Sequence, residues 1–554
     1  MPGNKQTICL AAIALCLAGC TVGPAYHEPK AALPAGFGEV GGIPGATPEA
    51  AGPSAGATSG QEADPELLAH WWTVFHDPTL DSLIARALDN NRDLKTAVSR
   101  VREARAEVEV ARGALLPEVD ASAGYNRALG SKNVVLPLGA LIGGSPPASS
   151  SKATSSQGIP TGTTRAVQAD DAAGGSSAGS ASGSGASFPP GGPSSPFGEG
   201  GLPGVTTNLY QAGFDAVWEV DVFGGTRRAI EAADAQAAAA QEGERGVRVT
   251  LLAEVASSYF QLRASQAREE VARRNLEAQR QTWKIADDKF KAGLGDEVQV
   301  AQQAAQLRVT EAMLPPLVAM ERSAQHALAF LLGAEPTALA AELSPPKALP
   351  ALPPEVPVGV PSELLRRRPD IRQAERNLAA ANAEVGVGTA QLFPQFSITG
   401  SFGLDSSDLK HLPEWGSHYY SIAPGIRWPI LDWTQLHAAI RVENEEQEQA
   451  MLAYQSAVAQ ALKDVEDALV QYETEHGRRA ALALAVLESL RAREVSAQIY
   501  AHGLADQLAT LEAERDLLQA EDTLAQSEAS LRMDLVSLYK ALGGGWGLPR
   551  QGRR

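Results

Sequence analysis

Residues 366–404 read RRRPDIRQAERNLAAANAEVGVGTAQLFPQFSITGSFGL. This stretch predicts a helix start, a long amphipathic helix, a break at Phe393-Pro394 and a strand in which large apolar residues alternate with small polar ones. Residues 91–125, NRDLKTAVSRVREARAEVEVARGALLPEVDASAGY, repeat the pattern without a gap at a shift of 277 positions. The matched pairs include Asp93 with Asp370, Ala97 with Ala374, Ala104 with Ala381, Val108 with Val385 and Pro117 with Pro394. The chain is therefore predicted to contain two copies of one structural unit.

The later parts of the two copies align at a different shift. Gly293 matches Gly503 and Leu332 matches Leu542, a shift of 210 positions. The difference of 67 residues is a net insertion in the first copy, and it falls in residues 130–207, which are dominated by Gly, Ser, Pro and Ala. Such a segment buries too little apolar surface to order itself. Because it lies between two predicted strands, we expect it to open into solvent.

Composition and charge exclude some classes of function. Aromatic residues are only 5% of the 554-residue chain, which suits extended helices better than a thick globular core. The formal charge of −18 argues against nucleic acid as a partner, since no basic patch would neutralise phosphates. The basic cluster Arg366-Arg367-Arg368 is expected to be a solvated helix end.

The N-terminal residues predict export and lipid attachment. Residues 1–19 have a cationic start and a short apolar core, as a secretory signal does. Leu17-Ala18-Gly19-Cys20 resembles the bacterial lipobox, which implies cleavage after Gly19 and acylation of Cys20; an ordinary signal peptide is the alternative. Thr21 stands where an Asp would favour inner-membrane retention, so the outer membrane is favoured. Residues 20–65, rich in Gly, Pro and Ala, are predicted to be a tether.

Long helices are predicted in both copies. No proline occurs between Gly225 and Leu314, so a helix over residues 226–291 would be about 100 Å long at 1.5 Å per residue. The chain then turns at residues 292–296 and returns to Gly333. In the second copy an average apolar spacing of 3.5 residues predicts a left-handed coiled-coil seam at Met451, Tyr454, Val458, Leu462, Val465, Leu469 and Tyr472.

Together with the signal and the tether, these elements divide the chain into five parts. The first repeat is predicted to span residues 66–345 and includes the insertion at 130–207. The second spans residues 346–546, and residues 547–554 form a C-terminal tail.

Four segments of about ten residues alternate as membrane strands do. The apolar and small residues that alternate along one face of each segment are Val119/Ala121/Ala123/Tyr125, Phe214/Ala216/Trp218/Val220/Val222, Phe396/Ile398/Phe402/Leu404 and Tyr420/Ile422/Ile426/Trp428/Ile430. No run of about eighteen apolar residues follows the signal, so strands are expected to make any crossing. Four strands cannot close on themselves and open edges are not tolerated in lipid, so several chains must pool their strands. The alternatives are a small soluble sheet on the helices and a plain coiled-coil spacer or stalk.

Three motifs together resemble a known family. WWTVFHDPTLDSLI at residues 71–84, the block at 366–403 and HALAFLLG at 326–333 are similar to TolC-like outer-membrane factors, specifically the NodT-type lipoproteins of RND efflux systems. The resemblance covers nearly all of the chain after the signal, except the tether and the insertion. It implies an α+β membrane protein of the outer membrane. Three chains would share one twelve-stranded β-barrel, continued by a periplasmic tunnel of helical hairpins.

The function implied by this resemblance is passive export of small molecules from an inner-membrane RND-type transporter through a periplasmic adaptor (membrane fusion) protein. A duct for type I protein secretion and a non-conducting coiled-coil lipoprotein are the alternatives. In the family the hairpin tips dock the adaptor, which here implies Gly293, Leu294, Gly503, Leu504 and Asp506.

The family also closes this end with carboxylates shortly after the second tip. Those positions fall on Ala509 and Glu512, so one acidic ring, at Glu512, would remain as a periplasmic constriction. Like charges from three chains would repel one another there. A solvated coiled-coil carboxylate is the alternative for Glu512.

No catalytic, cofactor or metal site is predicted. The nine histidines are scattered and none has metal-ligand spacing, so His411 and His418 are expected to be exposed loop residues. GSSAG at residues 175–179 matches the nucleophile-elbow pattern of hydrolases, and a lipid-anchored hydrolase with Ser177 as nucleophile is a further alternative. The strand and helix that this motif needs are not predicted around it.

Overall fold

The computed structural model describes residues 21–30, 33–34, 36–38, 57–59, 65–129, 205–353, 356–502, 504 and 507–547. The predicted signal with Cys20, nearly all of the insertion with its GSSAG motif, and most of the C-terminal tail lie outside these residues. The chain divides into two compact units. The helical unit comprises Met1–Leu116, Asp221–Gln395 and Arg427–Arg554, and the strand unit comprises Pro117–Val220 and Phe396–Ile426.

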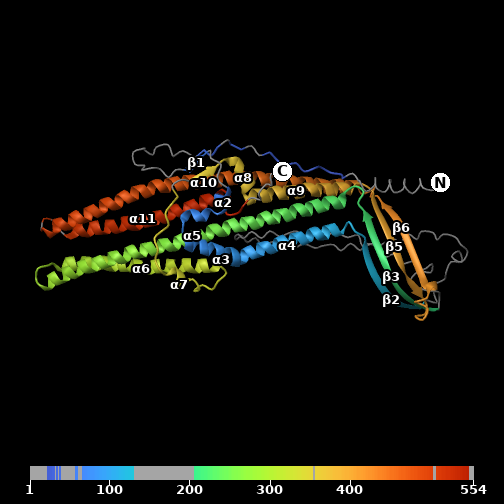
Figure 1. The fold of residues 1–554 in the computed structure, drawn as a ribbon, viewed down its shortest axis with the longest axis horizontal. Helices are drawn as coiled ribbons and strands as arrows, with labels where there is room; N and C mark the ends of the chain where they lie inside the picture. Colours follow the sequence, from blue (N-terminus) through green and yellow to red (C-terminus); the bar gives the residue numbers. More distant parts are fainter. Residues whose placement is uncertain are drawn as a thin grey trace, which may run out of the picture. The chain divides into compact units, whose positions relative to one another are not determined.

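The helical unit is built on two long hairpins, α5/α6 and α10/α11 (Figure 1). Helices α5 and α10 have 67 and 69 residues, which corresponds to about 100 Å each. A short parallel strand pair, β1 with β4, was not predicted. The elements of this unit are β1 (Ala57–Ser59), α2 (Pro65–Ala69), η2 (Trp71–Phe75), α3 (Pro78–Asn90), α4 (Arg92–Gly113), α5 (Gly225–Lys291), α6 (Glu297–Leu331), α7 (Ala340–Leu343), β4 (Val356–Gly359), α8 (Pro361–Arg367), α9 (Pro369–Ala390), α10 (Trp433–Ala501) and α11 (Gln507–Ala541).

The two predicted shifts are confirmed by the element boundaries. Helices α4 and α9 both have 22 residues, and their first residues, Arg92 and Pro369, are 277 positions apart. Helices α6 and α11 both have 35 residues, and their first residues, Glu297 and Gln507, are 210 positions apart. The chain is therefore a structural duplication.

Capping residues explain where the first helices begin. Asp77 precedes α3, and its carboxylate accepts a hydrogen bond from the Thr79 backbone N–H at 2.9 Å, while Pro78 lacks an N–H to satisfy. The Asn91 side chain caps α4 by accepting from the Leu94 N–H at 2.9 Å. Its amide also donates to the Leu331 carbonyl at 2.9 Å, so one buried side chain joins the start of α4 to the end of α6.

The core of the helical unit is aromatic where the short N-terminal helices meet the hairpins. Trp71 stacks on Tyr539 with ring centroids 5.4 Å apart, and Phe75 meets Phe260 edge-on at 4.8 Å. The coiled-coil seam predicted on α10 is buried: its fully buried members are Tyr454, Val458, Val465, Leu469 and Tyr472, with Met451 and Leu462 packed against them.

The strand unit is a four-stranded antiparallel sheet in the order β2-β3-β5-β6. Its strands are β2 (Glu118–Leu129), β3 (Thr206–Val220), β5 (Gln395–Ser406) and β6 (His418–Arg427), with the short helix η4 (Trp415–Ser417) before β6. Direct cross-strand partners share a face, and Ala121, Phe214 and Phe402 are such partners. The exposed large apolar residues of that face include Val119, Tyr125, Phe214, Ile398 and Phe402.

Two of the predicted strands were too long. Val222 lies beyond β3, because the chain turns there and the Asp221 carboxylate accepts from the Arg227 N–H at 3.0 Å. Trp428 and Ile430 lie beyond β6, since Pro429 between them has no N–H to donate to a neighbouring strand.

Candidate functional site

The first hairpin turn, Ala292–Asp296, depends on a glycine. Gly293 has φ +73°, a conformation that costs other residues energy. Its N–H donates to the Phe290 carbonyl, and the Leu294 N–H donates to the Lys289 carbonyl, each at 2.9 Å. These two bonds close the helix end as in a Schellman motif. They leave the Leu294 side chain 81% exposed at the turn.

The second hairpin turn repeats this arrangement. The Leu504 N–H donates to the Ile499 carbonyl at 3.1 Å, the same bond as in the first turn at a shift of 210 positions. The Leu504 side chain is 79% exposed. The other residues predicted here, Gly503 and Asp506, lie outside the described residues. Two exposed leucines therefore occupy equivalent places in the two repeats.

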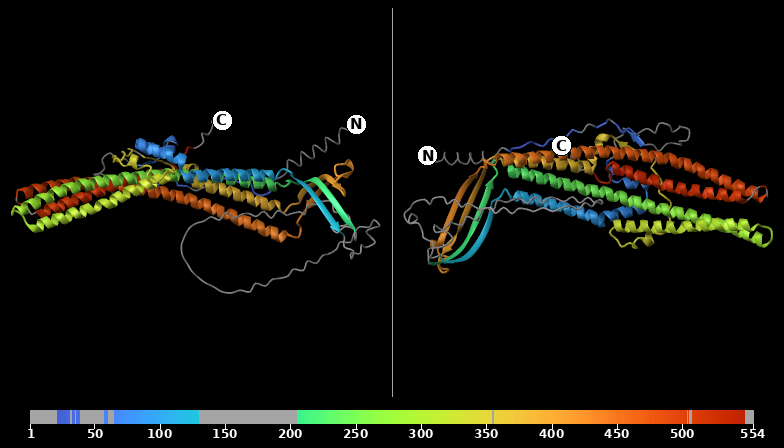
Figure 2. Two further views of the ribbon diagram at one scale, coloured as in Figure 1. Left: turned by 90° about the horizontal axis from the view of Figure 1, so that it is seen from below. Right: turned by 180° about the vertical axis from the view of Figure 1, so that it is seen from behind.

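The structure brings the two turns to one end of the helical unit (Figure 2). The Lys289 ammonium lies 5.3 Å from the centroid of the Tyr500 ring, so a cation–π contact joins the last turns of α5 and α10. Further from the turns, Asn275 on α5 donates to Glu521 on α11 at 3.2 Å. The hairpins are thus linked by side chains within one chain.

Glu512, the predicted constriction residue, lies in the second turn of α11 with an exposed side chain. Glu514, which was not predicted as a site residue, is half-buried rather than exposed. Burial raises the pKa of Glu514, and Arg493 on α10 partly offsets that rise. Its Oε2 is buried without a hydrogen-bond partner. The half-buried carboxylate of this region is therefore Glu514, which repeat alignment alone does not identify.

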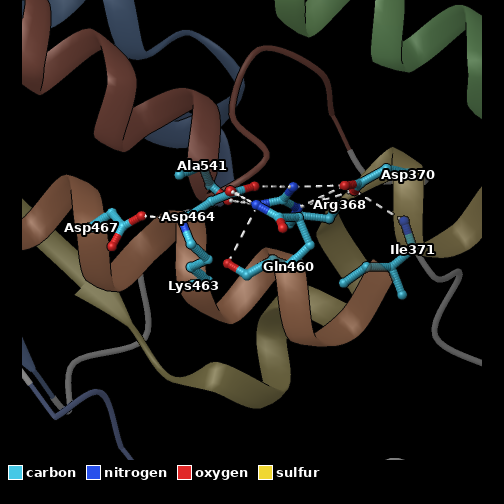
Figure 3. Close-up of polar contacts among 9 residues, drawn as sticks. Arg368, Asp370, Ile371, Gln460, Lys463, Asp464, Asp467 and Ala541 are labelled. Carbon is cyan, nitrogen blue, oxygen red and sulfur yellow. Dashed lines mark hydrogen bonds and ion pairs between the residues drawn. The ribbon is translucent and has the colours of Figure 1, made fainter. Parts of the chain in front are cut away.

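A buried arginine holds the start of α9 (Figure 3). The Arg368 guanidinium donates to the Asp370 carboxylate at 2.6 Å and to the Asp464 carboxylate on α10 at 2.8 Å. It also donates to the Ala541 carbonyl, at the end of α11, at 3.2 Å. Burial alone would lower the pKa of Arg368, but the two carboxylates raise it. One side chain therefore ties together α9, α10 and α11.

The expectation that residues 366–368 form a solvated helix end was wrong for two of the three. Arg366 is exposed, but Arg367 and Arg368 are only 9% and 8% exposed. The Arg367 carbonyl accepts from the Trp546 indole N–H at 3.1 Å. The sequence signal that could have indicated burial of Arg368 is Asp370, two residues later, because a buried charge needs a partner of opposite charge.

A cavity of about 400 Å³ opens beside Arg368. Both acidic and basic side chains line it. The charged lining residues are Arg368, Asp370, Asp464, Asp467 and Lys540.

Over the described part of the chain, no group of three or more His, Cys, Asp and Glu side chains is arranged to hold a metal ion. His411 is exposed, as predicted, and pairs with Glu414 at 2.9 Å. His418 is instead the first residue of β6 and stacks on Trp415. The described helices contain no segment long and apolar enough to span a membrane.

Comparison with known proteins identifies what this architecture serves. The family model described as "Outer membrane efflux protein" matches residues 83–160, 171–334 and 360–544. The pyoverdine export outer membrane protein OpmQ of Pseudomonas aeruginosa is 30% identical over 490 residues, covering 88% of this chain and 90% of its own. Nodulation protein T of Rhizobium leguminosarum bv. viciae is 28% identical over 545 residues, covering 98% and 94%.

A solved structure of an outer-membrane channel has the same fold. The outer-membrane channel OprN superposes with a TM-score of 0.75 at 31% identity, covering 96% of this chain and all of the other. The predicted fold of long helical hairpins with four antiparallel strands is therefore confirmed.

Proposed function

Because this chain belongs to the outer membrane efflux protein family and is an outer-membrane channel of efflux pumps, we propose that it acts as a homotrimeric, lipid-anchored exit duct. The chain is not an enzyme. The duct is passive: it lets small molecules leave once an inner-membrane pump has moved them. OpmQ is named for pyoverdine export, which is consistent with a small-molecule cargo.

The observation that supports a multimer is the open sheet of the strand unit, and the number three is taken from the family resemblance. Strands β2 and β6 are its edges, and in lipid the unpaired backbone groups of an edge strand are costly. A second copy of the chain satisfies them by pairing β6 of one copy with β2 of the next. Three copies then form a twelve-stranded barrel with the apolar face toward lipid.

The helical unit supports a periplasmic role. We assign the two turns, with Gly293, Leu294, Gly503, Leu504 and Asp506, to docking of a periplasmic adaptor protein. That adaptor joins the duct to an RND-type transporter. The exposed leucines of the turns support this assignment, since an exposed apolar side chain at a glycine turn gains from burial in a partner.

The N-terminal region supplies the membrane anchor. We assign residues 1–19 to a signal peptide, Cys20 to acylation after cleavage behind Gly19, and residues 20–65 to the segment that connects the lipid to the helices. Repeat 1 then spans residues 66–345 with the insertion at 130–207, repeat 2 spans 346–546, and 547–554 is a tail. The lipobox-like sequence before Cys20 supports the assignment.

The proposed constriction is an acidic ring at Glu512. Its exposed position near the second turn supports it, because a solvated carboxylate from each of three copies can face a shared axis. Such a ring favours cations over anions.

Reconstitution tests the duct. Purified protein in planar bilayers, with the adaptor present or the turns loosened by substitution, should conduct and should prefer cations. Glu512→Gln should reduce that preference. A Cys20→Ala protein should still require detergent, because its apolar strands are unchanged. A variant that is soluble in water without detergent would contradict the proposal. A trimer that shows no conductance under any of these conditions would also contradict it.

A further inference from the structure

The residues that follow Cys20 are seated on the helical unit. Residues 21–30 form neither helix nor strand, and they run beside α9 and α10 (blue trace in Figure 1). A chain without secondary structure must find partners for its backbone groups elsewhere. The contacts of this segment therefore show whether it is merely close to the helices or bound to them.

Its backbone groups are paired with the helical unit. The Val22 N–H donates to the Phe223 carbonyl at 3.1 Å. The Arg228 side chain donates to the Val22 carbonyl at 3.2 Å and to the Gly23 carbonyl at 3.4 Å. Arg228 is itself 7% exposed and held by Glu231 at 2.7 Å. A buried guanidinium, held in place by Glu231, thus donates hydrogen bonds to two successive carbonyls of the segment.

A second buried side chain continues the pattern. The Asn382 amide donates to the Pro24 carbonyl at 3.2 Å, and its oxygen accepts from Gln447 on α10 at 3.0 Å. Both polar atoms of this buried amide are therefore used, one by the segment and one by α10. Two residues later the Tyr26 hydroxyl donates to Glu375 at 3.3 Å.

Two glycines make the approach possible. Gly23 has φ +91°, and a Cβ there would lie 2.5 Å from the Cα of Gly386 on α9. A Cβ on Gly386 would lie 2.9 Å from the Cγ and Cδ of Arg228. Backbone therefore meets backbone at a distance that only glycine allows. Gly386 thus leaves room both for the backbone of Gly23 and for the Arg228 side chain that donates to the segment, which indicates a built binding surface.

We propose that residues 21–26 are a strap and that Phe223, Arg228, Asn382 and Gly386 form its seat. The seat contains residues from both repeats: Phe223 and Arg228 come from the first, and Asn382 and Gly386 from the second. The strap therefore clips the start of α5 to α9. It also holds Thr21 beside Gly224, because a Cβ on Gly224 would lie 3.0 Å from the Cα of Thr21. The strap thus sets the position of the lipid, a consequence that rests on the proposed acylation of Cys20.

Trypsin reports on the strap directly. Lys30 is the only Lys or Arg between residues 21 and 85, so cleavage in this range occurs only after Lys30. Protease cleavage of a docked segment requires local release. In the full-length purified protein, Gly23→Ala should raise the rate of cleavage after Lys30 about tenfold, the factor that corresponds to 1.4 kcal/mol. Gly36→Ala is the matched control, because a Cβ there meets nothing within 4 Å.

A second pair tests the seat from the other side. Gly386→Ala should accelerate the same cleavage, whereas Gly388→Ala on the same helix should not, since its Cβ makes ordinary contacts at 3.5 and 3.6 Å. Cleavage rates within the helices serve as an internal standard for global unfolding. Wild-type rates in both Gly23→Ala and Gly386→Ala, or equal acceleration in the controls, would overturn the proposal.

One further variant distinguishes the effect of the proposed lipid on the segment from the effect of the seat. Cys20→Ala should leave cleavage after Lys30 as slow as in the wild type, because the contacts that hold the strap in its seat are made by Thr21 and later residues. Faster cleavage would show that the lipid, not the seat, holds the segment. If mass spectrometry finds no lipid on Cys20, the proposed anchor fails while the strap result stands.

Discussion

The Arg268 guanidinium on α5 and the Asp522 carboxylate on α11 form a two-point contact, with hydrogen bonds of 2.7 and 3.2 Å. Their side chains are only 20% and 14% exposed. This pair joins the first hairpin to the second, between residues that are 254 positions apart in the chain. A planar, two-point ion pair of this kind fixes both distance and orientation.

Arg268→Gln should therefore destabilise the hairpin pair. It leaves a poorly hydrated carboxylate without its cation, at a cost of about 2–4 kcal/mol. The thermal unfolding midpoint in detergent should fall. Arg280→Gln on the same helix is the control, because its ion pair with Glu277 is 53% and 58% exposed and should contribute less than about 1 kcal/mol. Equal shifts in the two variants would show that burial of the pair is unimportant.

Arg368→Lys should also destabilise the protein although it keeps the charge. Lysine cannot reach Asp370, Asp464 and the Ala541 carbonyl with one planar group, so at least one buried acceptor loses its donor, at about 1–3 kcal/mol. Thermal unfolding measures the loss. Arg366→Lys, at an exposed neighbour, should leave the midpoint unchanged.

Stability should fall as the pH rises from about 4 to about 6. Burial and the nearby Glu475 raise the pKa of Asp534 from its ordinary value of 3.8 to about 6. Between these values the folded chain holds a proton that the unfolded chain has released, so raising the pH favours unfolding there. Asp534→Asn should remove this slope and raise the unfolding midpoint at pH 7, with no gain at pH 3.5. Asp516→Asn, at an exposed site, should preserve the wild-type profile.

Leu294→Ser with Leu504→Ser should weaken adaptor binding. Each leucine is exposed at its turn, and burying one in a partner contributes about 1.5–3 kcal/mol. The double variant should lose at least tenfold in affinity, measured by surface binding of the purified adaptor, while its unfolding midpoint stays at the wild-type value. Leu484→Ser, an exposed leucine on α10 away from the turns, is the control. Unchanged affinity would place the adaptor elsewhere.

Ile422→Lys should reduce the amount of protein in the outer membrane. Ile422 is 74% exposed on β6, and a lysine on a lipid-facing strand position costs about 2–4 kcal/mol at the bilayer centre. Ser421→Lys, one residue earlier and on the opposite face, should insert normally. Quantifying both variants in isolated outer membranes distinguishes the faces; equal yields would argue against a lipid-facing Ile422.

Most of the architecture was predictable because it is periodic and repeated. Internal repetition located both hairpins, and the 3.5-residue spacing on α10 identified the buried seam through Tyr472. Alternation placed the four strands, although it extended β6 to Ile430. The apolar residues continue to alternate past Pro429, but the strand's backbone hydrogen bonds do not, so the pattern alone predicted a strand that was too long.

The sequence by itself determined the duplication, the hairpins, the turn glycine at Gly293 and the four strands, because each depends on neighbours within a few residues or on self-similarity. Only the tertiary structure decided that Arg368 is buried, that Arg268 meets Asp522, and that Gly23 lies against Gly386. Each of these arrangements brings together residues from separate segments of the chain, which become close in space only after the helices have packed together. Local sequence patterns do not identify such partners, since burial and charge pairing are properties of the assembled fold.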